Sequence, residues 1–344
     1  MIVDLSKITS AMKKVSSFAK DVKTVPGVLL KVKDNVVEVC YSDGKKSIVE
    51  KIDVAMEESE EIGDIIVPYE NLMGIINSCQ PSTAIGCDEI EIEVGENNVL
   101  SISADKYAII ETDGEDGDFD TEKKIVSSFK YDITYSRPDE NIRYGILTRM
   151  DYGNIFESES ADIWDTKTLQ EMLNTLSKEK GKVVYFSGQL GAAFVVNMNH
   201  TVFINSADIV DNGFSLTTKM AKYLVEILQS TDDDKVMVSV EDQRYCKITT
   251  ESMGIWFEMS AASQMDIISL KHYQGREYKE YSIVFNRHAL QDVVRRAIAG
   301  GNSDSTSLTF KDTEDGLLVS IVSGGTASRS NKFFVMAEDY SDST

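Results

Sequence analysis

Residues 1–15 read MIVDLSKITSAMKKV, a short apolar strand that runs through a polar turn into an amphipathic helix. Apolar side chains recur at three- and four-residue spacing in this helix, so they gather on one face and leave the lysines on the other. The apolar face consists of Ile8, Ala11, Met12, Val15, Phe18 and Ala19, and the polar face of Lys7, Ser10, Lys13, Lys14, Ser17 and Lys20. We expect this helix to pack on a sheet and to present positive charge on its other side.

The same strand-to-helix pattern occurs five times in the chain. The other copies are DIIVPYENLMGIINS (64–78), ADIWDTKTLQEMLNT (161–175), GFSLTTKMAKYLVEIL (213–228) and YSIVFNRHALQDVVRR (281–296). Alternating apolar and polar residues follow, as in GVLLKVKDNVVEVCYS after the first helix, and this period is typical of half-buried antiparallel strands. The repeat predicts an α+β fold in which each unit is one helix plus a small antiparallel sheet.

The helix spacing leaves room for a sixth, degenerate unit. The segment 127–156 has strand character, but Pro138 and a polar run stand where a helix is expected. Six units pair into three domains, which we expect at residues 1–117, 118–212 and 213–344. The middle domain is then the diverged one, with a degenerate first helix.

Charge is distributed unevenly along this acidic chain. The formal net charge is -22, with 57 acidic and 35 basic residues, so the surface as a whole repels nucleic acid. Segments 7–23, 216–230 and 285–299 nevertheless hold ten basic and only three acidic residues. The other two helices do not share this bias. If the helices lie on one side of the molecule, that side attracts phosphates without reading bases.

The basic helices supply candidate DNA-facing residues. These are Lys7, Lys13, Lys14, Lys20, Lys23, Lys219, Lys222, Arg295 and Arg296. For any one helix alone, the alternative is an ordinary solvated face with no ligand.

This layout resembles the DNA sliding clamp family, specifically the beta clamp of bacterial DNA polymerase III. The resemblance covers nearly the whole chain and is carried by local stretches as well as by the repeat. Those stretches are VPGVLLKV (25–32), the second strand-to-helix copy, DEIEIEVGENNVLSISADKYAII (88–110) and EILQSTDDDKVMVSVEDQRYCKI (226–248). The acidic, diverged middle domain favours a bacteriophage-encoded member over a host housekeeping protein.

The resemblance implies a ring formed by oligomerisation, with helices lining a central hole and sheets forming the outer wall. Such a protein encircles double-stranded DNA non-specifically and tethers a DNA polymerase. The polymerase and a clamp loader bind it by short peptide motifs. It has no enzymatic activity and no cofactor. Three domains per chain fit a homodimer better than a trimer, because a dimer then makes a ring of six domains.

The resemblance also places a ring interface and a peptide pocket. The interface sets Tyr107 and Ile109 against Ile227 and Leu228, with ordinary core packing as the alternative for Leu228. The pocket is built from the last strand, at Phe334, Val335 and Met336, where a methionine suits several peptides. Filling the core of the third domain is the alternative for these three residues. The middle-domain loop MDYGNIFES (150–158) and the acidic tail depart from the family pattern.

Other protein classes find less support. The four cysteines form no CxxC pair, which argues against zinc and against a disulfide framework. No signal peptide or membrane span is predicted, so we expect a soluble, cytoplasmic protein. An acidic DNA mimic that binds DNA-processing enzymes without touching DNA is the main alternative function. A carboxylate-based hydrolase is supported only by the abundance of Asp and Glu in the chain.

Overall fold

The computed structural model describes most of the chain. The described residues are 1–19, 27–33, 35–56, 63–80, 86–113, 119–138, 145–158, 160–179, 182–188, 191–196, 201–205, 213–261, 281–284, 287–299, 306–313, 316–323, 331–336 and 339–342. They divide into two compact units, Met1–Leu270 and Lys271–Thr344.

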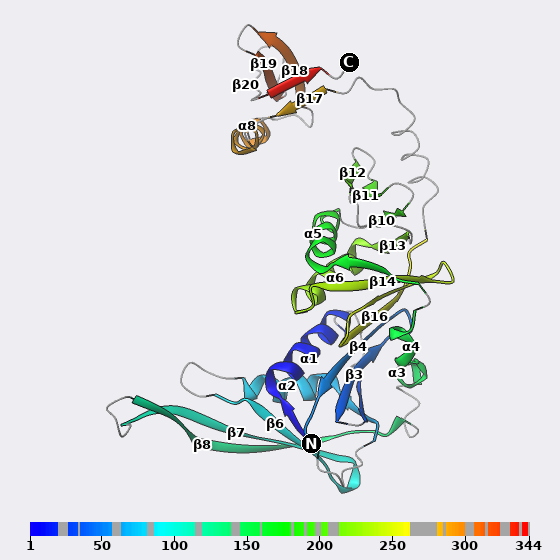
Figure 1. Cartoon of the computed structure of the whole chain (residues 1–344), viewed down its shortest axis with the longest axis vertical. Coiled ribbons are helices and arrows are strands. Elements are labelled where there is room, and N and C mark those ends of the chain that lie inside the picture. Colours follow the sequence, from blue (N-terminus) through cyan, green and yellow to red (C-terminus); the bar gives the residue numbers. More distant parts are fainter. Residues whose placement is uncertain are drawn as a thin grey trace. The chain divides into compact units, whose positions relative to one another are not determined.

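The first unit contains four copies of a strand, a helix and three further strands (Figure 1). The first copy is β1 (Ile2–Asp4), α1 (Leu5–Ala19), β2 (Gly27–Lys33), β3 (Val36–Ser42) and β4 (Lys46–Asp53). The second is β5 (Ile65–Pro68), α2 (Tyr69–Cys79), β6 (Glu89–Val94), β7 (Val99–Asp113) and β8 (Phe119–Thr134). The third is β9 (Asp162–Asp165), α5 (Thr166–Leu176), β10 (Val183–Ser187), β11 (Ala192–Val196) and β12 (Thr201–Asn205). The fourth is β13 (Phe214–Thr217), α6 (Thr218–Gln229), β14 (Lys235–Glu241), β15 (Tyr245–Thr249) and β16 (Met253–Glu258).

The second unit contains a fifth copy. It consists of β17 (Tyr281–Val284), α8 (Arg287–Ala299), β18 (Thr306–Thr313), β19 (Gly316–Ser323) and β20 (Asn331–Met336), followed by β21 (Asp339–Asp342), which pairs with β17. All five predicted strand-to-helix steps are therefore confirmed.

Neighbouring copies exchange their first strands. In the first pair, β1 joins β6 and β5 joins β2, which gives the sheets β5-β2-β3-β4 and β1-β6-β7-β8. In the second pair, β9 joins β14 and β13 joins β10 in the same way. The exchange ties the third and fourth copies together, so the structure does not separate the chain at the predicted boundary between residues 212 and 213.

The structure also replaces the predicted degenerate unit. The alternating residues of 119–134 form β8, the third strand of the second copy, because they pair with β7 along its full length. After β8 come two short helices, α3 (Gly145–Arg149) and α4 (Gly153–Phe156), without a meander of their own in the described residues. The helix of the third copy is α5, which is regular and not degenerate.

An antiparallel joint between β4 and β16 connects the two exchanged pairs. It merges two sheets into one of eight strands, in the order β5-β2-β3-β4-β16-β15-β14-β9. The helices α2, α1, α6 and α5 follow one another across the first unit, and each contacts the next (Figure 1). The first unit is thus a helix layer packed on sheets.

A polar residue between strand and helix starts three of these helices. The Asp4 carboxylate accepts hydrogen bonds from the Ser6 and Lys7 amides at 2.7 and 3.1 Å, and also from the Ser6 hydroxyl. All three bonds lower the pKa of Asp4, and the bond from the hydroxyl has the largest effect. Asp165 accepts from the Thr168 amide at 2.7 Å in the same position of the third copy. Such caps satisfy amides that the first helical turn leaves unpaired. Thr217 does the same for α6, by accepting from the Met220 amide at 3.1 Å.

The eight-stranded sheet is covered on both faces near the joint. Along β4, Ile48 points into the main core under the helices, and Val49 points into a smaller core on the other face. This explains why the strands there are nearly continuous apolar runs. The four cysteines are free and buried, so they serve as small core side chains.

Trp164 provides a test of the strand exchange. It lies on the exchanged strand β9, is fully buried, and meets Phe186 and Phe214 edge to face at 5.7 and 6.3 Å between ring centroids. We expect Trp164→Ala to lower the free energy of unfolding by about 3–5 kcal/mol, measured by urea denaturation. The neighbouring Ile163 is 65% exposed, and Ile163→Ala should change it by less than about 0.5 kcal/mol. Equal losses in both variants would contradict the assigned register.

Candidate nucleic-acid interface

The sides of α1 and α6 that turn away from the sheet carry exposed lysines. These are Lys7, Lys13, Lys219 and Lys222. The one exposed acid on these two helices, Glu226, accepts a hydrogen bond from the Ser17 hydroxyl at 2.9 Å. Lys7 lies 3.8 Å from Asp53, with both side chains mostly exposed. Lysine therefore dominates this surface, as predicted from the sequence.

The exposed lysines of α1 and α6 belong to one helix layer, because the two helices contact each other. Phe18 and Tyr223 meet edge to face at 6.3 Å between ring centroids. The Lys46 ammonium lies against both rings, 5.1 Å from the centroid of Phe18 and 4.5 Å from that of Tyr223. A cation in contact with two aromatic rings stabilises this crossing.

Lys14 does not belong to the exposed surface, and its prediction as a DNA-facing residue is wrong. Its side chain is 4% exposed, and its ammonium donates to the Glu50 carboxylate on β4 at 2.6 Å. The helical wheel placed Lys14 with the other lysines, but α1 is enclosed on more than one side. A buried ammonium requires such a partner, because burial without one is costly.

Other predicted DNA-facing residues fall elsewhere in the chain. Lys20 and Lys23 lie outside the described residues. Arg295 is exposed on α8 of the second unit. Arg296 is on the same helix, and its side chain lies outside the described part.

The outer face of the sheet β1-β6-β7-β8 is acidic. On β6, Glu89, Glu91 and Glu93 are exposed and alternate with Ile90 and Ile92, which are buried in the core on the helix side. Lys130 on β8 pairs with Glu93 at 2.8 Å, and this hydrogen bond lowers the pKa of Glu93. Helix and sheet surfaces of the first unit thus differ in charge here, as the sequence predicted.

The predicted interface residue Tyr107 belongs to a polar cluster on β7. Its hydroxyl donates to Asp88, whose other carboxylate oxygen accepts from Lys123 at 2.5 Å. These bonds, that of Lys123 first, lower the pKa of Asp88. Gly86 lies against the ring, since a Cβ there would be 2.8 Å from it. Tyr107 is therefore held in place within its own chain.

Ile109 lies on a ribbon of β7 and β8 that exposes apolar side chains on both faces. The exposed fractions are 65% for Ile109, 37% for Ile110, 59% for Ile125 and 50% for Val126. The neighbouring strand β6 pairs with β7 only between Leu100 and Ser103, so the ribbon extends beyond it (Figure 1). Within the described residues, β8 ends this sheet. Long edge strands with exposed apolar residues are typical of sites where another chain binds.

The other half of the predicted interface is buried. Ile227 and Leu228 on α6 are 0% and 2% exposed and belong to the main core of their own chain. The packing of α6 between α1 and α5 encloses both residues, so the alternative given for Leu228, ordinary core packing, is correct, and Ile227 is a core residue as well.

The predicted pocket residues lie on β20 in the second unit. Phe334, Val335 and Met336 pair with Ser320, Val319 and Leu318 of β19. Their side chains lie outside the described part, so their role stays a prediction.

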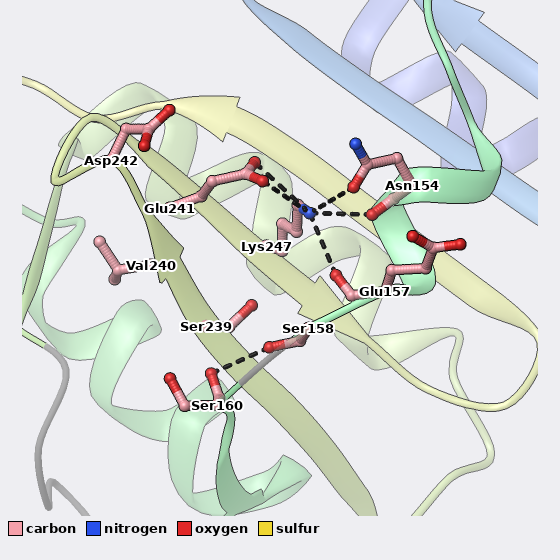
Figure 2. A pocket seen from close by; sticks show the side chains of 9 residues that line it. All are labelled: Asn154, Glu157, Ser158, Ser160, Ser239, Val240, Glu241, Asp242 and Lys247. Carbon is pink, nitrogen blue, oxygen red and sulfur yellow. Dashed lines mark hydrogen bonds and ion pairs between the residues drawn. The ribbon is translucent and has the colours of Figure 1, made fainter.

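A polar cavity of 560 Å³ opens beside Lys247 on β15 (Figure 2). Its lining includes Glu157, Glu241 and Asp242 as well as serines. The Lys247 side chain is buried, and its ammonium is enclosed by four oxygen acceptors from Asn154, Glu157 and Glu241. The lysine is fully satisfied within the chain, and its contacts hold the segment around α4. Its sequence signal is a single charged residue in the short strand YCKIT, and this signal does not distinguish a buried lysine from an exposed one.

Two general features of the described residues bear on the kind of protein. They include no cluster of three or more His, Cys, Asp and Glu side chains placed to hold a metal ion. None of their helices is both long enough and apolar enough to span a membrane.

The whole chain resembles solved bacterial beta clamps. The beta subunit of DNA polymerase III from Thermotoga maritima matches with a TM-score of 0.63 at 15% identity, over 100% of this chain and 84% of that one. The subunit from Pseudomonas aeruginosa matches with a TM-score of 0.64 at 15% identity, over 100% and 85%. The sliding clamp of Bacillus subtilis matches with 0.65 at 14% identity, over 99% and 84%. No family model and no curated protein sequence matches the chain.

At these identities the comparison establishes the fold. The prediction of an α+β fold of the beta clamp type is therefore confirmed.

Glu50 provides a test of the buried pair with Lys14. Burial raises the pKa of Glu50 above its ordinary value of 4.5, although Lys14 opposes the shift. A raised pKa means that the folded state holds this proton more tightly than the unfolded state, so stability falls as pH rises from 4.5 toward the raised pKa. We expect the free energy of unfolding to decrease more steeply with pH over this window in the wild type than in Glu50→Gln. Equal slopes would show that Glu50 does not titrate abnormally.

Proposed function

We propose that this protein is a non-catalytic DNA sliding clamp, a processivity factor that encircles duplex DNA and tethers a polymerase. The observation that carries the proposal is the set of exposed lysines on the adjoining helices α1 and α6, on a clamp fold whose outer sheet face is acidic. Lys7, Lys13, Lys219 and Lys222 are the proposed DNA contacts in the first unit. Arg295 and Arg296 on α8, with Lys20 and Lys23, extend the proposal.

The charge pattern fits contact with the phosphate backbone. Lysines on a helix surface meet phosphates as point charges and carry no sequence information. Binding of this kind is weak, non-specific and steeply dependent on salt. A ring adds topological retention to such weak contacts, so the protein stays on DNA while it slides.

The β4–β16 joint inside the chain suggests how two protein chains associate. The joint pairs third strands, β4 of the first copy and β16 of the fourth. The corresponding strand of the second copy is β8, which is an edge in the described structure. We propose that a second copy of the chain covers this edge and the ribbon with Tyr107 and Ile109. A homodimer is favoured over a trimer.

The partners of this clamp would be a DNA polymerase and a clamp loader, bound through short peptide motifs. Phe334, Val335 and Met336 on β20 remain the proposed pocket. Bacteriophage origin also stays a prediction.

An acidic DNA mimic is the second candidate, and the net charge of -22 favours it. The two functions differ in whether the protein stays on closed DNA. A clamp loaded on circular DNA is retained and is lost when the circle is linearised. Equal loss from circles and linear DNA would support the mimic.

Charge reversal on the helix layer tests the DNA contacts. We expect Lys13→Glu and Lys222→Glu each to weaken DNA binding and to lower the slope of log K against log salt by about 0.9 per lost phosphate contact. Lys235→Glu is the matched control, because Lys235 is an exposed lysine on β14 and the substitution changes the net charge equally. Binding titrations over a salt series measure the slope. The same loss in all three variants would indicate a net-charge effect and remove Lys13 and Lys222 from the DNA path.

Solution mass tests the proposed edge. We expect the wild type to have twice the mass of the 38.3 kDa chain. Ile109→Asp should shift it toward the single-chain mass, because it places a charge in an apolar contact. Light scattering over a concentration series measures both. Glu91→Gln on the outer face should keep the wild-type mass, and a dimer unaffected by Ile109→Asp would exclude the ribbon as the interface.

A further inference from the structure

A segment between the second and third copies lies across the joint on the face opposite the helix layer. We name this segment, residues 145–158, the brace; it contains α3 and α4. Helix α3 contacts β2 and β3 of the first copy, and α4 contacts β15 and β16 of the fourth. The brace therefore touches the sheet on both sides of the β4–β16 joint.

Three apolar side chains anchor the brace. Leu147, Tyr152 and Ile155 are 3%, 0% and 1% exposed. They pack against strand residues of the outer face, namely Leu29, Cys40, Val49 and Ile66. The Tyr152 hydroxyl donates to the Leu147 carbonyl at 3.0 Å, which joins the residue before α4 to α3.

The brace meets both strands of the joint at one crowded point. Gly254 of β16 pairs with Val49 of β4. A Cβ at Gly254 would lie 2.8 Å from Ile155 and 3.1 Å from Val49. Only a glycine lets the brace approach so closely. On the β4 side, the Lys51 ammonium lies 3.7 Å from the centroid of the Phe156 ring.

Lys247 fastens the end of the brace to β15 (Figure 2). Its ammonium donates to the Asn154 carbonyl at 2.8 Å, to the Asn154 side-chain oxygen at 3.0 Å and to the Glu157 carbonyl at 3.1 Å. These three acceptors belong to the brace and match the three N–H groups of an ammonium. Glu241 on β14 adds a carboxylate at 3.4 Å. The lysine is 4% exposed, so detachment of the brace would remove three of the acceptors of this buried ammonium and leave it with the Glu241 carboxylate.

We propose that the brace, latched by Lys247, is the conformational device that holds the β4–β16 joint closed. The joint itself is a ladder of five residue pairs between two strand edges. On one face, α1 and α6 cover it, and on the other face the brace is anchored to strands of both pairs. Detaching the brace uncovers the outer core at the joint and frees the two exchanged pairs to move relative to each other. The polar cavity beside Lys247 gives water access to the latch. This inference holds whether or not the protein is a clamp.

Hydrogen exchange on the full chain tests the proposal. We expect Lys247→Met, which keeps the aliphatic stem and removes the ammonium, to lower the protection of the brace and of the joint together by about tenfold. The amides to follow are those of residues 145–158 and of β4 and β16, with β11, which the brace does not cover and which is paired on both edges, as the internal reference that stays protected. Lys235→Met on the neighbouring strand is the matched control and should leave every amide unchanged.

Loss of protection confined to the brace would overturn the proposal, because the joint would then be closed without it. Unchanged protection in both places would overturn it too. If Lys247→Met fails to fold, Tyr152→Phe is measured instead, because it removes only the hydrogen bond from the Tyr152 hydroxyl to the Leu147 carbonyl of α3. That variant should raise exchange in the brace and the joint in parallel, and an effect on the brace alone would again count against the device.

Discussion

The pairing of β4 with β16 is the contact on which the rest of the first unit depends. Each exchanged pair of copies satisfies its own inner strands but leaves third strands with unpaired backbone groups. Joining two such strands removes two edges at once and brings α1 against α6. The continuous helix layer, on which the exposed lysines of α1 and α6 lie, depends on this ladder.

Lysine has three different roles around this joint. Lys13 and Lys222 are exposed and available to a polyanion, Lys14 is buried with Glu50 under α1, and Lys247 is buried under the brace. The ammonium group is the same in every case, and the acceptors around it differ. Buried lysines are paired with oxygen atoms of their own chain, so only the exposed ones can contribute to an electrostatic surface.

Much of the fold and part of the candidate site could be predicted from local pattern. Five helices were placed correctly, because 3.6-residue apolar periodicity is a property of each segment alone. The bias toward lysine on the first and fourth helices was also visible. The third strand of the second copy was misassigned to a new unit, because an alternating strand does not reveal which neighbour it pairs with. Ile227 and Leu228 were misassigned for a similar reason, since an apolar face can pack within a chain or between chains.

The sequence by itself determined the repeated strand-helix-meander unit, the polar caps that start the helices and the uneven distribution of charge. Only the tertiary structure decided which copies exchange strands, that Lys14 is buried while Lys13 is exposed, and that residues 145–158 lie across the joint. The physical reason is that periodicity and capping depend on residues a few positions apart. Pairing of strand edges and enclosure of a charge depend on residues far apart in the chain, such as Lys247 and Asn154, whose meeting no local pattern records.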